Sequence, residues 1–246
     1  MNTRLHDAND AVRQGLESLG DKAREKFAEV KPRMRGWLHL GTTPLTLAAG
    51  IVLIVLSPTT STKVASALFT GTALLLFGVS ALYHTRSWSP RAWNLLRRLD
   101  HSNIFLLIAG SYTPFSIILL DGVERVVLLS VVWGGALLGV AFRVFWTDAP
   151  RWLYVPIYIA LGWAAVFFIP SFYGGAIDLG LGIGIATFVL IVTGGALYTF
   201  GGVVYGLKRP NPWPRWFGFH EVFHTFTVLA FAAHYVGVSL ATYSLR

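Results

Sequence analysis

Two histidines, His220 and His224, stand four residues apart near the C-terminal end of the sequence. If this segment is helical, they share one face, with about 5–6 Å between their Cβ atoms. Two imidazoles at that spacing can bind one metal ion, because histidine is a common zinc ligand. A chance coincidence, or packing at a helix interface, is the alternative interpretation of the same spacing.

His84 is a third candidate ligand, and three histidines in a chain without cysteine suit zinc, with a fourth position left for water or substrate. Zinc can lower the pKa of such a water to about 7. Asp100 would then accept the proton of this water as a general base, or hold it by hydrogen bonding. Ser80 precedes His84 by four residues, so its hydroxyl can orient the imidazole or a bound water. For Asp100 the alternative is an ion pair with Arg97 or Arg98.

Three other ionisable residues are weaker candidates. Glu221 is rotated by about 100° from His220 on a helix, so we expect it to face elsewhere. His234 lies about 15 Å along the helix from His224, too far to share an ion. It is expected to be a satisfied buried imidazole or part of a second polar site. A haem-binding role is poorly supported, because no other helix offers a second histidine near the middle of the membrane. His101 is expected to hydrogen-bond a neighbouring helix.

The elements that must position these residues are predicted to be membrane-spanning helices. The chain has 246 residues, of which 54% are hydrophobic and only 13% charged, whereas soluble domains carry about 25% charged residues. This composition argues against a soluble globular protein and against a disordered chain. A membrane helix needs about 20 mostly apolar residues. The sequence contains such runs at Leu40–Leu56, Val64–Tyr83, His101–Leu120, Val126–Phe145, Trp152–Phe172, Leu179–Tyr205 and Phe219–Tyr243. We therefore predict an all-α integral membrane protein, a bundle of seven transmembrane helices.

Lysine and arginine are distributed unevenly between the two ends of these spans. Of the 20 in the chain, all but Lys63, Arg125 and Arg246 fall on the N-terminal segment and the loops on its side. Because basic residues are retained on the cytoplasmic side, we predict a cytoplasmic N-terminus and a C-terminus outside. The net charge of +8 is thus explained by orientation, and no nucleic acid partner is expected.

On this topology three spans bring the candidate residues to one depth. His84 closes the second span at the cytoplasmic side, Asp100 opens the third, and His220 and His224 open the seventh. Ionisable groups at the border of the hydrocarbon are costly unless paired, hydrated or metal-bound, so each indicates a functional site.

Residues 1–36 differ from the transmembrane domain, which we place at residues 37–246. This segment mixes basic and acidic residues with apolar residues at helical spacing, and it lacks the apolar core and cleavage site of a signal peptide. We predict a cytoplasmic amphipathic helix that lies on the membrane surface or against the protein's own loops and ends at Pro32. A flexible polar tail is the alternative.

Three motifs in this order resemble a known family: Ser80-Ala-Leu-Tyr-His84, Leu99-Asp100-His-Ser-Asn-Ile-Phe-Leu-Leu-Ile-Ala-Gly-Ser-Tyr-Thr-Pro114 and His220-Glu-Val-Phe-His224. The chain is similar here to the hemolysin III branch of the progestin and adipoQ receptor (PAQR) family. The resemblance implies a seven-helix bundle with zinc near the cytoplasmic face. It implies His84, His220 and His224 as ligands, Asp100 as a contact through water, and Ser80 as its partner. The wider superfamily includes alkaline ceramidases, which hydrolyse a lipid amide with a similar constellation.

The leading hypothesis is a zinc-dependent hydrolase of a lipid amide or ester in a bacterial plasma membrane, with an effect on membrane lipid homeostasis. Membrane lipids are then the expected partners, and the oligomeric state is left open. One alternative is a non-enzymatic sensor or homeostasis protein in which structural zinc ties the spans together. Another is a pore-forming cytolysin, which the sequence disfavours because no span has a continuous polar face.

Overall fold

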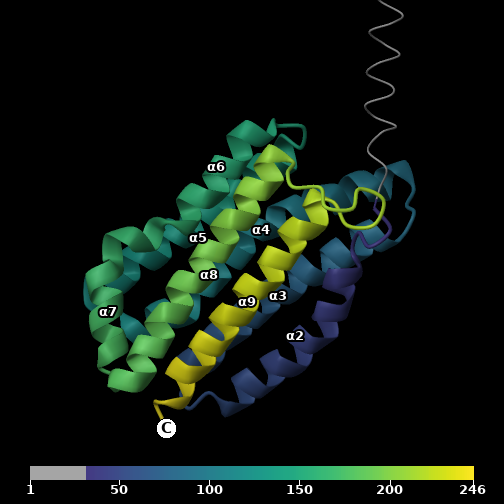
Figure 1. Ribbon diagram of the computed structural model, residues 1–246. Helices are drawn as coiled ribbons and strands as arrows, with labels where there is room; N and C mark the ends of the chain where they lie inside the picture. The colour runs from purple at the N-terminus through teal and green to yellow at the C-terminus, as the bar shows by residue number, and fades with distance from the viewer. Residues whose placement is uncertain (1–31) are drawn as a thin grey trace, which may run out of the picture.

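The computed structural model describes residues 32–246, which form a bundle of helices (Figure 1). Seven helical segments are long and apolar enough to cross a membrane. They are α2 (Trp37–Leu56), α3 (Thr60–Thr85), α4 (Pro90–Leu119), α5 (Gly122–Phe145), the broken segment α6 (Arg151–Gly162), η1 (Ala164–Phe168) and α7 (Ile169–Ile177), then α8 (Leu181–Leu207) and α9 (Phe219–Tyr243). No strand is present in this part of the chain. The predicted seven-helix, all-α membrane bundle is confirmed.

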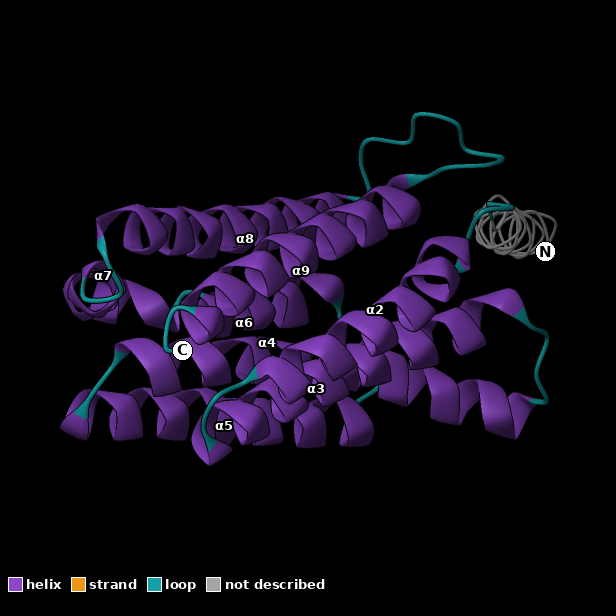
Figure 2. Cartoon of the chain, turned by 90° about the horizontal axis from the view of Figure 1, so that it is seen from below, coloured by secondary structure: helices purple, strands orange, loops and turns teal. Residues whose placement is uncertain are grey.

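Helix α4 lies at the centre of the bundle. Its membrane window is 72% buried, against 22% for α2 and 17% for α8, and it packs against α3, α5, α6, α7 and α9. Figure 2 shows α8 and α9 side by side, with α3, α4 and α5 across the bundle from them. The helix that carries Asp100 is therefore enclosed by the others.

The core and the outer surface are both apolar. Aromatic side chains fill the interior, among them Phe69, Phe77, Phe115 and Phe231. Large hydrophobic residues such as Leu45, Leu138 and Val192 are exposed on the outside. A bundle whose backbone bonds are satisfied within helices and whose outer face is apolar is suited to a lipid environment.

Helix α4 begins earlier than the sequence predicts. We expected the third span to start at His101 after a loop around residues 84–100, but α4 starts at Pro90. Proline is favoured in the first turn of a helix, and the Ala92 N–H donates to the Ser89 hydroxyl, 3.4 Å away, as an N-cap. Asp100 and His101 therefore lie inside a helix and do not open it.

The predicted fifth span is interrupted. Helix α6 ends at Gly162, a short 3₁₀ segment follows, and α7 completes the crossing. The Tyr112 hydroxyl of α4 donates to the Gly162 carbonyl at 2.6 Å and accepts from the Ala165 N–H at 2.9 Å. Backbone groups that the break releases thus find partners inside the protein, as a membrane interior requires.

The segment predicted as an amphipathic helix or flexible tail lies mostly outside the described residues, which begin at Pro32. Residues 32–36 form a turn that leads into α2, which begins at Trp37.

Candidate metal centre

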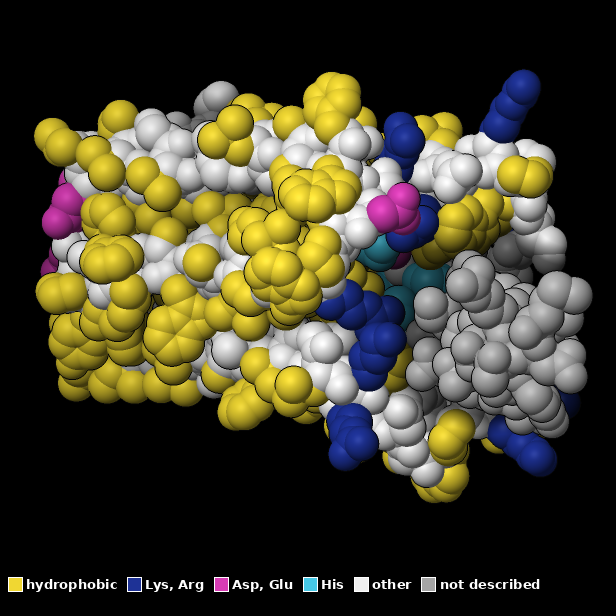
Figure 3. All heavy atoms as spheres, turned by 90° about the horizontal axis from the view of Figure 1, so that it is seen from above, with side chains coloured by type: hydrophobic (Ala, Val, Ile, Leu, Met, Phe, Trp, Pro, Cys, Tyr) yellow, Lys and Arg dark blue, Asp and Glu magenta, His cyan; other side chains and the backbone are white. Residues whose placement is uncertain are grey.

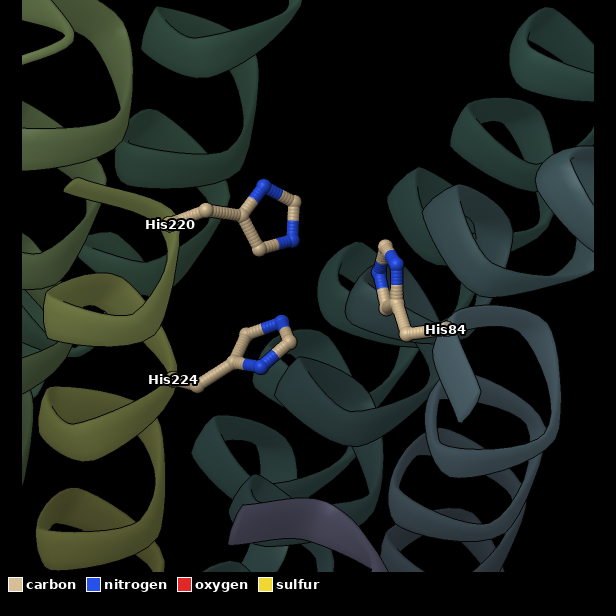
Figure 4. A group of neighbouring side chains, drawn as sticks. All are labelled: His84, His220 and His224. Carbon is tan, nitrogen blue, oxygen red and sulfur yellow. The ribbon is translucent and has the colours of Figure 1, made fainter. Parts of the chain in front are cut away.

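Three histidines from two helices meet at one end of the bundle (Figure 4). His84 is in the last turn of α3, and His220 and His224 are in the first turns of α9. Each ring offers a nitrogen, and these nitrogens lie within 4.8 Å of one another. All three side chains are buried. The three histidines can therefore hold one metal ion.

The start of α9 explains why two of these rings face the same way. Glu221 is the third residue of the helix, and its Oε2 accepts the Gly218 N–H at 2.8 Å, which caps the first turn. His220 and His224 then fall on one face, with 4.6 Å between their ring centroids. Glu221 points to the cap and away from the ion position, as its rotation on the helix predicts.

The chemistry of the donors fits a metal ion. Nδ1 of His224 is buried and has no hydrogen-bond partner among the described residues. An unsatisfied buried nitrogen costs on the order of 1–3 kcal/mol. The fit rests on the donor set, because three buried imidazoles, with one nitrogen of each within 4.8 Å of the others, can donate to a single ion. Imidazole nitrogens suit zinc and its neighbours among the transition metals.

Asp100 reaches this centre from α4. Its Oδ2 lies 3.7 Å from Nε2 of His84, which is beyond a direct hydrogen bond and invites a bridging water. The Ser80 hydroxyl is within hydrogen-bonding reach of the Asp100 carboxyl, to which it donates. Arg97 pairs with Asp148 at 2.8 Å, so the ion pair of Asp100 with Arg97 does not form.

His39 is a fourth buried histidine at the centre, and the sequence reasoning missed it. Its ring stacks on that of His224, with 3.9 Å between centroids and 21° between planes. Neither of its nitrogens has a hydrogen-bond partner in the described part of the chain. The predicted first span began at Leu40, one residue later, so the search for ionisable residues at span ends passed over His39.

His101 lies next to Asp100 but has a separate partner. Its Nδ1 is 2.8 Å from Nη2 of Arg143, and because a guanidinium only donates, Nδ1 must accept and Nε2 carries the proton. Arg143 is fully buried and also donates to the carbonyls of Trp146 and Thr147. The charge distribution in the sequence places Arg143 among the basic residues of the loops, but the structure shows it as a buried residue of α5 that joins α5 to α4.

His234 lies along α9 from the centre, and only one of its two ring nitrogens is paired, because Nδ1 has no hydrogen-bond partner within the described residues. Its Nε2 is 3.2 Å from the Ile191 carbonyl oxygen, to which it donates. The ring sits between the rings of Phe115 and Tyr198, each 5.6 Å away. The ring is therefore buried, as the sequence suggested, but it is satisfied at Nε2 only.

A cavity of about 320 Å³ extends from the centre between the helices. Ser80, Asp100, His220 and His224 line one end, and apolar side chains line most of the remainder. Part of the lining belongs to side chains that are exposed on the outer surface of the bundle, on η1, α7 and α8: Val166, Ile169 and Val192. The cavity therefore extends from His220, His224 and Asp100 toward the apolar outer face, and His84 is not among its lining residues.

Figure 3 shows the surroundings of the site from outside. Hydrophobic side chains cover most of this face, whereas arginines and lysines gather at one end, and histidine side chains are visible in a hollow there. We call this the basic end of the bundle. Two of the arginines lie at the start of α9, where Arg35 pairs with Glu221 and Arg151 lies over the Phe219 ring.

The structure thus belongs to the class of multi-pass helical membrane proteins, and it carries three buried histidines at one end of the bundle. The chain belongs to the haemolysin-III related family, whose model matches residues 27–235. It is 32% identical to Hemolysin-3 of Bacillus cereus, over 75% of this chain and 79% of that protein. It is likewise 32% identical to the Hemolysin-3 homolog of Bacillus subtilis (strain 168), over 65% of this chain and 68% of that protein.

More distant similarity reaches the receptors of the PAQR family. The chain is 28% identical to the Adiponectin receptor protein of Drosophila melanogaster, over 68% of this chain and 40% of that protein. The matches agree with the hemolysin III branch of the PAQR family that the three motifs indicate.

Proposed function

We propose that this protein is a zinc-dependent hydrolase of a lipid amide or ester, with its site near the cytoplasmic face of a bacterial plasma membrane. One observation carries the proposal: the candidate metal centre lies at the polar end of an apolar cavity that reaches the outer surface of the bundle. A metal site that faces such a cavity has room for a substrate, whereas a closed structural site does not.

His84, His220 and His224 would hold the ion in this proposal. Three neutral imidazoles leave a coordination position open, the arrangement of catalytic zinc sites. When bound, zinc would act as a Lewis acid and lower the pKa of a water molecule to about 7.

Asp100 and Ser80 supply the proton transfer. The carboxylate of Asp100, 3.7 Å from His84, would accept a proton from the attacking water, and the Ser80 hydroxyl would keep the carboxylate in place. Hydrolysis then breaks the C–N or C–O bond of the substrate. The hydroxyl of the water goes to the acyl carbon, and the proton on Asp100 goes to the leaving amine or alcohol.

The cavity selects a substrate with a long acyl chain. Its walls include Ile104, Leu107, Ile108 and Phe188, which offer an apolar lining to a hydrocarbon chain. The exposed lining residues on η1 and α8 provide lateral access from the bilayer. The scissile group would sit at the histidine end, where Asp100 lies.

A second candidate, a sensor or homeostasis protein with structural zinc, is favoured by a different observation. The candidate ligands come from α3 and α9, whose backbones lie apart and which pack together through side chains such as Phe77 and Phe231. An ion bound by His84, His220 and His224 would therefore tie these helices together. Under this candidate the metal stabilises the bundle and no lipid is cleaved.

The test uses purified protein whose zinc content has been verified. It is offered ceramides and other acyl amides and esters, and the products are followed by mass spectrometry. We expect release of a fatty acid from at least one lipid class, and a loss of about 10²-fold or more in rate in Asp100→Asn with zinc still bound. If every lipid stays intact and Asp100→Asn changes nothing in cells, the hydrolase is excluded and the structural candidate takes its place.

A further inference from the structure

Residues 32–36, which we call the strap, lie across the basic end between α2 and the loop that precedes α9. The Arg33 N–H donates to the Arg215 carbonyl at 3.1 Å, and the Met34 N–H donates to the Trp216 carbonyl at 3.2 Å. The Arg33 guanidinium also lies over the Trp216 ring, 4.7 Å from its centroid. The strap is therefore attached by its backbone to the chain segment that leads into the metal-binding turns.

An ion pair joins the strap to α9 between the two histidines of that helix. Nε of Arg35 is 3.0 Å from Oε1 of Glu221, whose side chain is fully buried. The other carboxylate oxygen accepts the Gly218 N–H. Because both carboxylate oxygens are engaged, the Glu221 side chain is held in one orientation. This in turn holds the first turn of α9, which carries His220 and His224, in one rotation about the helix axis.

The last residue of the strap touches the third histidine. Gly36 has φ +87°, and a Cβ built on it would lie 2.7 Å from Cβ of His84. Only glycine adopts this conformation readily, and only glycine leaves room for the strap backbone against His84. One short segment thus contacts both helices that bear the candidate ligands.

We propose that the strap positions the metal centre, with Arg35 and Glu221 fixing the rotation of α9 and Gly36 setting how closely α3 approaches. This inference rests on the proposed metal site. The backbones of α3 and α9 lie apart, and these helices meet deeper in the bundle, where Phe69 and Phe77 pack against Phe231. Their spacing at the ligands therefore depends also on the segments that bridge them at the basic end. Residues that orient metal ligands without touching the ion commonly contribute 10- to 100-fold, roughly, to metal affinity.

The test compares Arg35→Gln with Arg33→Gln in otherwise intact protein. Both changes remove one positive charge from the strap, but only Arg35 reaches Glu221. Zinc affinity is measured in detergent by competition with a chelator, and Co²⁺ is used as a spectroscopic probe of ligand geometry. We expect roughly 10- to 100-fold weaker zinc binding and an altered Co²⁺ absorption spectrum in Arg35→Gln. Arg33→Gln loses only the contact with Trp216 and keeps the backbone hydrogen bonds of the strap, so we expect a much smaller change in both properties.

Two further variants keep the test decisive if Arg35→Gln fails to fold. The double variant Arg35→Gln/Glu221→Gln removes the buried charge pair and retains an acceptor for the Gly218 N–H. Gly36→Ala perturbs the contact with His84 and leaves the ion pair in place. Both are expected to weaken zinc binding.

Wild-type zinc affinity and an unchanged Co²⁺ spectrum in the folded strap variants would overturn the strap proposal, even if their melting temperatures fall. Absence of zinc binding in the wild-type protein would instead overturn the metal site itself. The two failures are thus distinguishable.

Discussion

The buried histidines of this bundle differ in the hydrogen-bond partners of their ring nitrogens. Nδ1 of His101 accepts from Arg143, and Nε2 of His234 donates to a backbone carbonyl. Nδ1 of His224, both nitrogens of His39 and Nδ1 of His234 have no such partner within residues 32–246. A buried polar atom without a partner requires an explanation, and two of these three histidines, His39 and His224, stack on each other at the candidate metal centre.

Spacing and depth in the membrane were sufficient to predict which histidines converge. The interval between His220 and His224 and the matching depth of His84 both follow from the sequence. The stacking of His39 on His224 and the burial of Arg143 do not, because they depend on how α2 and α5 rotate about their axes. Hydropathy fixes the length of a membrane helix but not this rotation.

Arg143 offers a prediction at the scale of the residue. Arg143→Met leaves His101 and the carbonyls of Trp146 and Thr147 without their buried donor. We expect a loss of about 2 kcal/mol or more of stability, seen as a lower melting temperature in detergent. Arg97→Met is the control, because its partner Asp148 is 83% exposed and such surface pairs contribute about 1 kcal/mol or less. Equal effects of the two changes would contradict the structural role of Arg143.

At the scale of the element, the sequence locates all seven spans but not their ends. Helix α4 begins at Pro90 because Ser89 and Pro90 start a helix there. The arginines between residues 90 and 100 interrupt hydropathy, so the apolar run in the sequence begins only at His101. The break between α6 and α7 was not predicted either. It depends on Tyr112 of α4, which satisfies backbone groups on a helix distant in sequence.

Close packing of α7 and α8 provides a prediction at this scale. A Cβ at Gly184 would meet the carbonyl oxygen of Ala176 in α7, whereas a Cβ at Gly182 meets nothing within 4 Å. Gly184→Ala is expected to cost about 1–3 kcal/mol by overpacking. Gly182→Ala should be neutral or stabilise slightly, by up to about 1 kcal/mol, because alanine favours the helix. Melting curves of both variants in one detergent test this, and a neutral Gly184→Ala would refute the close contact.

At the scale of the whole molecule, the two ends of the bundle differ in charge, because lysines and arginines gather at one of them (Figure 3). The sequence predicts that all but three of the 20 basic residues lie on the side of the N-terminus, and the assignment of that side to the cytoplasm stays a prediction. The three histidines lie at that same basic end (Figure 3). The cavity leads from two of them, His220 and His224, toward side chains on the apolar outer surface such as Val192.

The central claim is that the three histidines bind a metal ion, and elemental analysis tests it most directly. Protein is purified without chelators, and the zinc content of the wild type is compared with that of His220→Ala and of the control His234→Gln, whose histidine lies away from the centre. We predict about one zinc per chain in the wild type and in His234→Gln, and a large loss in His220→Ala. Equal zinc content in the wild type and His220→Ala would contradict the account.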